Sequence, residues 1–440
     1  MPVLNHFTIM KYYSLNNTQH KVSFKDAAIT GIAPDKGLYF PESIPQLDAD
    51  FIENIENYSE AEIAYKVIAP FIGDEIPEHK LRQIVEETLS FPFPLVEVEE
   101  DVYALELFHG PTMAFKDVGA RFMSRCLNYF TQDETNKKIT ILVATSGDTG
   151  GAVASGFLGV EGINVVILYP SGKVSDVQEK QLTTLGQNIT ALEVKGTFDD
   201  CQDMVKKAFL DEELKDVSLT SANSINIARW LPQMFYYFFA YKAFKAKGKP
   251  LAVAVPSGNF GNICAGMMAN KIGLPIAHFI AATNANDTVP RFMDTQEYTP
   301  KQTIETLSNA MDVSNPSNFV RILELFDKEF GILDKAFTSY SFTDKQTIET
   351  LQKVYTEDEY LCDPHGAVGY LGLKKYMETN KGYTGVFLET AHPVKFADSI
   401  VKNLGIEIPV PEQIKSVMNG EKKVITASSY EGLKEYLLSV

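Results

Sequence analysis

Apolar runs and turn residues alternate along the middle of the chain in an order typical of parallel β-sheets. Ile139–Ala144 is an apolar run rich in β-branched residues, a glycine-containing loop follows it, and the small residues of Gly151–Phe157 favour a helix. A second apolar run, Asn164–Pro170, comes next. Short apolar runs bounded by turn signals are typical of buried strands. The segment therefore predicts a strand–loop–helix–strand unit.

The same order recurs about a hundred residues later. Leu251–Pro256 predicts a strand, a Gly/Asn loop follows, Ile263–Lys271 favours a helix, and Ile276–Ala281 predicts another strand. Two such units indicate an α/β fold with largely parallel sheets. In sheets of this kind ligands bind beyond the carboxyl ends of the strands, which is where both loops fall.

The first part of the chain has a different character. Short apolar runs alternate there with Pro- and Gly-containing turns and with helical spacing such as Ser59–Ile68, and Phe91–Pro94 disfavours helix and marks a boundary. We therefore expect an N-terminal domain over 1–95, a larger α/β domain over 96–135 and 223–440 with a peripheral, mainly helical region near 285–360, and a smaller, mobile α/β domain over 136–222.

Length and charge narrow the possible functions. The chain has 440 residues, of which 45% are hydrophobic and 22% charged, so it is too long for one compact core and too apolar for whole-chain disorder. Its formal net charge of −17 argues against nucleic acids and anionic membranes as partners. An acidic protein that binds a phosphorylated small molecule needs a local pocket of backbone amides and a few cations.

Cysteine and histidine positions give no sign of a metal site or a disulfide framework. The four cysteines show no CxxC spacing and the seven histidines form no HExxH pair, so we expect reduced thiols and no bound metal. The first residues lack the pattern of a signal peptide, and no apolar run reaches the roughly 18 residues that a membrane span requires. We expect a soluble, cytoplasmic protein.

Two of the predicted loops carry candidate anion-binding groups. Ser257–Asn262 joins a strand to a helix, and its glycines and helix-start amides could hold a phosphate, although an ordinary turn would have the same look. A dinucleotide site is disfavoured because the GxGxxG spacing is missing. Thr145–Gly150 occupies the equivalent place in the first unit. Asp148 within it would oppose an anion, so we expect it to meet a hydroxyl or a cation, or to cap the helix.

Three further segments each contain one candidate residue. Lys116 lies in an apolar stretch after the strand-like Tyr103–Phe108, and a buried lysine has an amine whose pKa is lowered enough to react. Arg229 follows several polar amides and suits planar phosphate recognition. Thr390 follows the strand-like Gly385–Leu388. Taken singly, Lys116 is better interpreted as a lysine that reaches solvent from a helix start. A structural arginine and a strand-end hydroxyl are equally acceptable interpretations of the other two residues.

The order and combination of these segments are more informative than any one of them. HGPTMAFKD, TSGDTG, NSINIAR, PSGNFGN and ETAHPVKF follow one another along the chain, and this series resembles the threonine synthases. Tyr12–Asn16 and Gly37–Pro41 resemble the start of the branch with an extra N-terminal domain. The resemblance covers most of the chain and is weakest at 285–360. It implies the fold of fold-type II pyridoxal-phosphate (PLP) enzymes, which is like that of the tryptophan synthase β-subunit.

The resemblance also implies roles for individual residues. Lys116 would form the Schiff base with PLP, and Thr390 would face the pyridine nitrogen. Asp148 would lie near the cofactor hydroxyl, a contact that many relatives make through asparagine. The amides that would hold the cofactor phosphate are those of Gly258, Asn259, Phe260, Gly261 and Asn262. The residues that would hold the substrate phosphate and carboxylate, without assignment between the two groups, are Thr145, Ser146, Thr149, Asn223 and Arg229.

The implied activity converts O-phospho-L-homoserine and water into L-threonine and phosphate, in a monomer or a homodimer. Another fold-type II activity, such as serine or threonine dehydration, is the nearest alternative and would need no site for a substrate phosphate. A PLP-binding relative without catalysis and a nucleotide-binding α/β module are alternatives from other classes. An intact lysine and two anion-type loops favour the enzyme.

Overall fold

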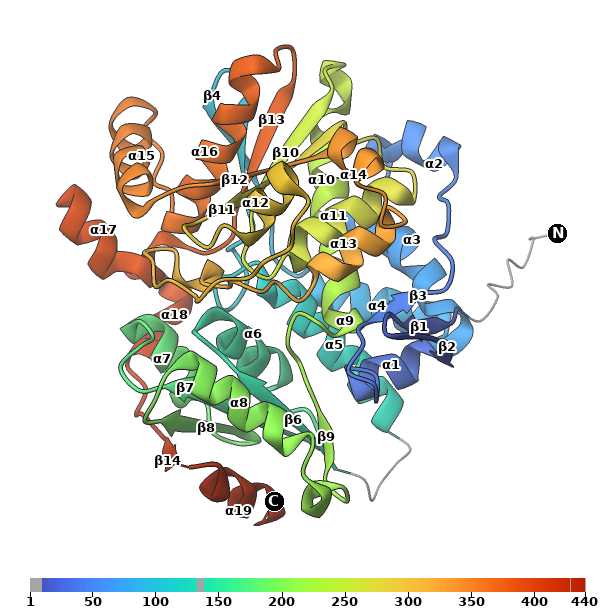
Figure 1. The fold of residues 1–440 in the computed structure, drawn as a ribbon, viewed down its shortest axis with the longest axis vertical. Helices are drawn as coiled ribbons and strands as arrows, with labels where there is room; N and C mark the ends of the chain where they lie inside the picture. Colours follow the sequence, from blue (N-terminus) through green and yellow to red (C-terminus); the bar gives the residue numbers. More distant parts are fainter. Residues whose placement is uncertain (1–9, 133–137, 428, 440) are drawn as a thin grey trace.

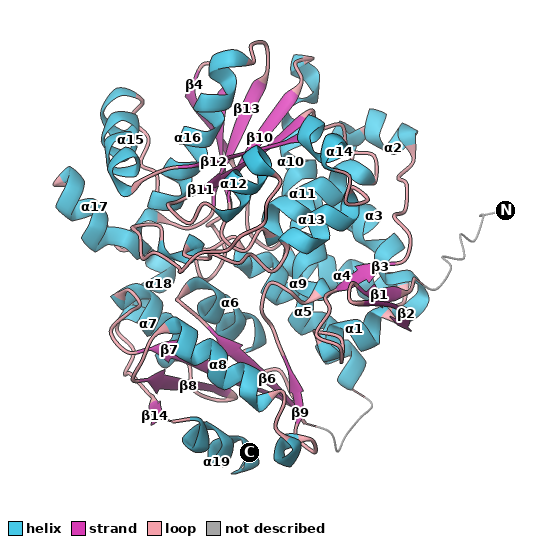
Figure 2. Cartoon of the chain, viewed as in Figure 1, coloured by secondary structure: helices cyan, strands magenta, loops and turns pink. Residues whose placement is uncertain are grey.

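The structure is a computed structural model that describes residues 10–132, 138–427 and 429–439. In these residues the strands form two sheets with helices on both sides and one small N-terminal sheet (Figure 1; Figure 2). Within the same residues, none of the helices combines the length and the apolar character needed to cross a membrane.

The larger sheet has the strand order β12-β11-β10-β13-β5-β4, and only β4 runs antiparallel to its neighbour among the described strands. The bounds are β4 Leu95–Glu99, β5 Val102–Glu106, β10 Leu251–Pro256, β11 His278–Thr283, β12 Phe337–Ser341 and β13 Thr384–Glu389. Its central strand β10 is buried on both faces, as its continuous apolar sequence predicts.

Side-chain alternation along β10 explains how both faces are covered. Val253 and Val255 belong to one apolar cluster, which includes the helices α10 (Met234–Phe244) and α11 (Gly261–Lys271). Ala252 and Ala254 point the other way, into a cluster with α15 (Asp344–Glu357) and α16 (Pro364–Thr379). Successive residues of a strand point to opposite faces, so a fully apolar strand needs helices on both sides.

The smaller sheet is parallel throughout its described strands and has the order β14-β8-β7-β6-β9. The bounds are β6 Ile139–Ala144, β7 Ile163–Pro170, β8 Ile189–Val194, β9 Ser218–Thr220 and β14 Ile425–Ala427. In Figure 1 this sheet lies below the larger one, with α6, α7 and α8 around it.

The N-terminal part packs mainly against the helices that cover the two sheets. Its antiparallel strands follow the order β2-β1-β3, and the hydroxyl of Tyr12 donates to the carbonyl of Phe71, 2.6 Å away. Both residues belong to the same apolar cluster as Val253 of β10. The bounds here are β1 Tyr12–Ser14, β2 Asn17–Val22, β3 Tyr39–Pro41, α1 Phe24–Thr30, α2 Ala49–Glu53, α3 Glu60–Ile72 and α4 Glu78–Thr88.

The remaining helices connect the strands and cover the sheets. They are α5 Lys116–Thr131, α6 Asp148–Phe157, α7 Asp176–Thr183, α8 Phe198–Ala208, α9 Ile227–Trp230, α12 Thr288–Thr295, α13 Phe319–Leu325, α14 Phe330–Ala336, α17 Ala397–Leu404, α18 Glu412–Met418 and α19 Tyr430–Ser439.

The two-sheet α/β fold is confirmed, and the structure differs from the expectations in two places. The region near 285–360, expected to be mainly helical, also contributes a strand, because β12 lies within it and pairs with β11. The last residues do not join the larger unit 223–440: β14 pairs with β8 in the smaller sheet, and α19 packs its Leu433 and Leu437 into the apolar cluster of α8. Pairing across sheets depends on where the chain returns, which local sequence patterns do not specify.

Candidate active site

The five candidate segments all follow the carboxyl ends of strands, and the structure brings them to the junction of the two sheets. In the larger sheet β10, β13 and β5 are neighbours. Ser257 follows β10, Thr390 follows β13, and the segment that ends at Lys116 follows β5. From the smaller sheet, Thr145 follows β6 and Asn223 lies beyond β9.

Lys116 is the first residue of α5, and the turn before it is held rigidly. The carboxylate of Asp117 accepts a hydrogen bond from the amide of Thr112 (2.9 Å) and another from its hydroxyl (2.5 Å). The amide of Phe115 donates to the carbonyl of Thr390 at 2.9 Å. Gly110 is required here, since a Cβ at this position would lie 2.4 Å from an Asp117 carboxylate oxygen. Lys116 is therefore fixed beside the end of β13.

The amine of Lys116 lies in a buried, charged environment. Its side chain is 16% exposed, and Nζ is 3.8 Å from Oδ2 of Asp148. Burial lowers the pKa of Lys116; Asp148 opposes this shift, while the positive charges of Lys395 and Arg229 add to it. A lysine with a lowered pKa is a better base and nucleophile near neutral pH, so the environment suits amine chemistry.

Asp148 begins α6 and is bound by two further side chains. One carboxylate oxygen, Oδ1, accepts hydrogen bonds from Nζ of Lys395 at 2.8 Å and from Nε2 of Gln178 at 3.0 Å. Burial on its own would raise the pKa of Asp148, but the charges of Lys395 and Lys116 hold the pKa well below its usual value. The prediction that Asp148 meets a cation is confirmed, whereas capping of α6 by its side chain is not seen, because Gly147 takes the N-cap position.

Lys395 is the functional candidate that the sequence analysis missed. It lies in the short 3-10 turn Pro393–Phe396 after β13, and its side chain is fully buried. The signal that could have found it is the one that marked Lys116, a single lysine in an otherwise apolar segment.

The Thr145–Gly150 loop uses one of its hydroxyls to keep its own shape. Oγ1 of Thr145 accepts from the amides of Gly147 (3.0 Å) and Gly150 (2.9 Å). Ser146 and Thr149 are partly exposed, and within the described chain their hydroxyls make no hydrogen bond to protein. These two residues are therefore the ones in the loop whose hydroxyls could meet a ligand.

The Ser257–Asn262 loop has the features of a phosphate cradle. Phe260 adopts a left-handed conformation with φ 59° before α11 begins. As far as the described residues show, the amides of the segment 258–262 donate to no other protein group. Nδ2 of Asn262 is likewise buried without a partner. Free amides at the start of a helix bind phosphate well, so the loop fits a phosphate group.

The cradle is held from behind by a separate segment. Gly258 packs so closely against the backbone of Met311 that a Cβ would lie 2.6 Å from its Cα. The side chain of Asn259 accepts from the amide of Ser317 at 2.6 Å and donates to Ser224 at 2.8 Å. The second of these bonds links the cradle to the segment of Asn223. The region 285–360 therefore supports the site rather than lying apart from it.

Arg229 is buried beneath the same segment. Its guanidinium donates to the carbonyl of Ala222, its Nε has no protein partner among the described residues, and its backbone lies against Gly119 of α5. Burial lowers the pKa of Arg229 to about 10, which leaves the guanidinium charged at neutral pH. Arg229 thus anchors the segment just before Asn223, and its positive charge helps to lower the pKa of Lys116.

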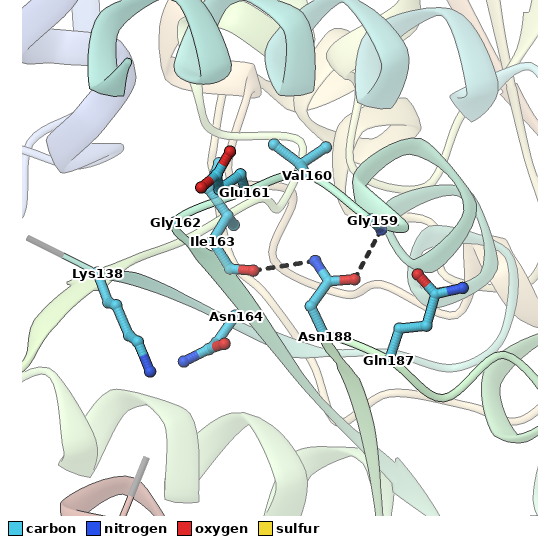
Figure 3. A pocket seen from close by; sticks show the side chains of 9 residues that line it. All are labelled: Lys138, Gly159, Val160, Glu161, Gly162, Ile163, Asn164, Gln187 and Asn188. Atoms are coloured by element: carbon cyan, nitrogen blue, oxygen red, sulfur yellow. Dashed lines mark hydrogen bonds between the residues drawn. The ribbon is translucent and has the colours of Figure 1, made fainter. Parts of the chain in front are cut away.

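A different hollow contains none of the predicted site residues. Figure 3 shows it at the amino ends of β6, β7 and β8, with a volume of about 230 Å³. Asn188 spans it by donating to the carbonyl of Ile163 (2.9 Å) and accepting from the amide of Gly159 (2.8 Å). The hollow lies at the amino ends of the strands of the smaller sheet, whereas the Thr145 loop lies at their carboxyl ends.

Comparisons with known proteins agree with this arrangement. The family described as "Pyridoxal-phosphate dependent enzyme" matches residues 89–390. The family described as "Threonine synthase N terminus" matches residues 11–89, and the one described as "Threonine synthase, C-terminal" matches residues 366–437. A threonine synthase of Haemophilus influenzae is 48% identical over 92% of this chain and 94% of its own length. The chain belongs to the threonine synthase family.

Solved structures of the family superpose closely on the chain. The crystal structure of threonine synthase from Escherichia coli matches with a TM-score of 0.91 and 43% identity, covering 98% of this chain and 100% of that one. PLP-bound threonine synthase from Brucella melitensis matches with a TM-score of 0.90 and 36% identity, covering 97% and 98%. Membership of the threonine synthase family makes this chain a PLP-dependent lyase, and PLP is its cofactor.

Proposed function

We propose that this enzyme converts O-phospho-L-homoserine and water into L-threonine and inorganic phosphate, with Lys116 as the reacting lysine. The observation that carries the proposal is the meeting of a buried lysine with two anion-type loops. One loop comes from each sheet, and both face the junction where Lys116 lies 3.8 Å from Asp148. An enzyme whose cofactor and substrate both carry phosphate needs two such loops.

The residues around Lys116 fit the cofactor. Its aldehyde would be held by Nζ of Lys116 and its phosphate by the free amides of the segment 258–262. Thr390, which is buried and joined through its carbonyl to Phe115, would meet the pyridine nitrogen. A neutral hydroxyl there does not enforce protonation of the ring, unlike a carboxylate. When bound, PLP supplies an electron sink for the carbon atoms of the substrate.

The chain itself supplies the proton transfers. Nζ of Lys116, freed when the substrate amine takes its place on the cofactor, would take the proton from Cα, which ends on the departing phosphate, and would then take the proton from Cβ as that phosphate leaves from Cγ. The same amine returns protons to Cγ and, after water has added at Cβ, to Cα. One residue can serve every transfer because the turn before α5 holds it in one place. Burial lowers the pKa of Lys116, which makes its unprotonated form more accessible.

Polar groups of both sheets would hold the substrate. Four candidate groups lie around the junction: the available hydroxyls of Ser146 and Thr149, the side chain of Asn223 and the charged guanidinium of Arg229. Arg229 would act both through its charge and by fixing the carbonyl of Ala222 just before Asn223. Loss of one phosphate-binding arginine costs roughly two orders of magnitude in rate in sites of this kind. Closure of the smaller unit would shield the reacting carbon atoms from bulk solvent while keeping the one water molecule that adds at Cβ.

The test is to incubate the purified protein and PLP with O-phospho-L-homoserine and to assay threonine and phosphate together. Equal amounts of both products are expected. Phosphate without threonine, or ammonia release from serine or threonine that survives Arg229→Ala, would favour the dehydratase alternative. Borohydride reduction followed by peptide mapping should label Lys116; a label on another lysine would overturn the assignment.

The assembly, the location and the partners of the enzyme belong to the same proposal. We propose a monomer or a homodimer that works in the cytoplasm on a small-molecule substrate. The acidic balance of the chain, with a net charge of −17, disfavours nucleic acid as a partner. Light scattering of the purified enzyme tests the first point, since a larger mass than a dimer would contradict it.

A further inference from the structure

Lys395 has no part in the reaction described so far, yet its ammonium lies fully buried beside the reacting groups. It projects from the 3-10 turn Pro393–Phe396, which follows β13 of the larger sheet. Its partner Asp148 starts α6 after β6 of the smaller sheet, 247 residues away in the sequence. A buried charge is costly unless it is paired, so a pair that joins the two sheets at the reacting lysine needs an explanation.

The two oxygens of Asp148 are used differently. Oδ1 is bound by Lys395 at 2.8 Å and by Gln178 at 3.0 Å. Oδ2 faces Lys116 at 3.8 Å, which is beyond hydrogen-bond distance. One carboxylate thus lies between two lysines, and it forms its hydrogen-bonded ion pair with Lys395, the lysine that does not react.

The position of Lys395 is fixed by its own turn. Nδ1 of His392 accepts from the amide of Val394 at 3.1 Å, and the carbonyl of His392 accepts from the amide of Lys395 at 3.1 Å. On the other side, Gln178 packs so closely on Gly147 that a Cβ there would lie 2.4 Å from its amide carbon. Local contacts thus hold the backbone turn that carries Lys395 and leave room for Gln178 beside Gly147.

We propose that Lys395 is a positioning residue for the reacting lysine: its ammonium takes the Asp148 carboxylate as its own ion-pair partner across the junction of the two sheets and leaves the Lys116 amine free to react. The inference rests on the proposed function in one respect, that Lys116 is the lysine that binds the cofactor. Without Lys395, Asp148 would have only one cation beside it, and Lys116 would become its permanent ion-pair partner.

The charges that face the two lysines come from several elements. Lys116 is influenced by Asp148 of α6, Lys395 of the turn after β13, Arg229 of α9 and Asp363 before α16. Lys395 also influences Asp117 of α5 and its neighbour His392. Loss of Lys395 removes one positive charge from this set and frees the carboxylate, and both changes favour the protonated form of Lys116.

The experiment measures how fast the full-length protein, stripped of cofactor, forms its covalent bond to added PLP at different pH values. The bond forms from the unprotonated amine with loss of water, so the pH of half-maximal rate reports on Lys116. Lys395→Met should move this midpoint upward by about 1–3 pH units, the effect of a neighbouring opposite charge. Lys395→Arg keeps the charge and should stay close to the wild-type midpoint.

Asp148 provides the matched controls. Asp148→Asn should move the midpoint downward, because Lys116 then loses its nearest negative charge while Lys395 and Arg229 remain, and the double variant Lys395→Met/Asp148→Asn should return toward the wild type. An unchanged midpoint in folded Lys395→Met, or an equal shift in Lys395→Arg, would overturn the proposal. If Lys395→Met does not fold, the double variant, which leaves no unpaired carboxylate, is compared with Asp148→Asn, and equal midpoints in these two would also overturn it.

Peptide mapping after borohydride reduction separates this inference from the proposed function. If the wild type carries the label on a residue other than Lys116, the assignment of the reacting lysine fails. If the label is on Lys116 and the midpoints do not move, only the role of Lys395 fails.

Discussion

The two sheets contribute to the site by different physical means. The larger sheet offers neutral groups: backbone amides after β10 and the hydroxyl of Thr390 after β13. These groups form the neutral half of the site, whereas the charged half joins Asp148 of the smaller sheet to Lys116 and Lys395 of the larger one. A cradle of amides depends on the shape of the backbone, whereas a buried ion pair depends on every charge around it. The two halves should therefore fail in different ways.

The largest effect is expected at the charged half. Lys116→Ala removes the group that we assign to every proton transfer, so turnover should fall by about 10³–10⁴-fold, at the upper end of the range for acid–base catalysis. Threonine formation at saturating substrate measures it. Turnover above a tenth of the wild-type value would show that another residue carries the protons.

The neutral half should respond to shape instead of charge. Gly258→Ala places a Cβ 2.6 Å from Cα of Met311, so the cradle must shift, and overpacking of this kind costs about 1–3 kcal/mol. We expect weaker PLP binding, measured by equilibrium titration of the cofactor. Gly331→Ala in α14 is the control, because nothing lies within 4 Å of its added Cβ. Equal PLP affinity in the two variants would contradict a shape-dependent cradle.

The turn that carries Lys395 should make the charged half sensitive to acid. Burial, with the neighbouring charge of His109, lowers the pKa of His392 to about 4, while an unfolded histidine titrates near 6.5. Between these values the unfolded chain binds a proton that the folded one does not, so stability is lost as pH falls from about 6.5 to 4. The loss at pH 5 relative to pH 7 should be about 1–2 kcal/mol.

His392→Asn should reduce this dependence, since asparagine can still accept from the amide of Val394 without taking up a proton. Urea unfolding at both pH values measures the difference. His79→Asn, an exposed position on α4, is the matched control and should keep the wild-type slope. Identical slopes in all three proteins would contradict a role for His392.

The smallest effect on catalysis is expected at the amino ends of the strands of the smaller sheet, away from the candidate site. Asn188→Ala removes its hydrogen bonds to Phe157, Ile163 and Gly159 at the hollow of Figure 3, which should lower the free energy of unfolding by about 1–3 kcal/mol. The turnover of folded protein should stay unchanged. A matching loss of turnover would show that the site extends to the amino ends of these strands.

Several parts of the fold could be predicted from the sequence because they are local. The apolar runs at Ile139–Ala144 and Leu251–Pro256 are strands with those bounds, since a strand buried on both faces must be apolar throughout. The strand Phe337–Ser341 was missed. It lies at an edge of its sheet and mixes hydroxyls with apolar residues, which gives no continuous run.

The candidate site could likewise be predicted only where the signal is local. Lys116 and the two loops could be found because each has a local signal, a lone lysine or glycines at a helix start. The pairing of Lys395 with Asp148 could not, because it depends on two sheets meeting and no spacing in the sequence records that contact. Arg229 was predicted as a ligand-binding residue, and its second role, anchoring the carbonyl of Ala222, appears only in three dimensions.

The pairing of β14 with β8 has a consequence for how the protein is made. The smaller sheet acquires its outer strand, Ile425–Ala427, and a covering helix, α19, from residues that leave the ribosome long after its other strands (Figure 1). Until then β8 is an unpaired edge that can bind other strands. The smaller sheet, whose first strand begins at Ile139, is therefore completed only after Ile425–Ala427 has been made, and chains cut short before residue 425 expose that edge.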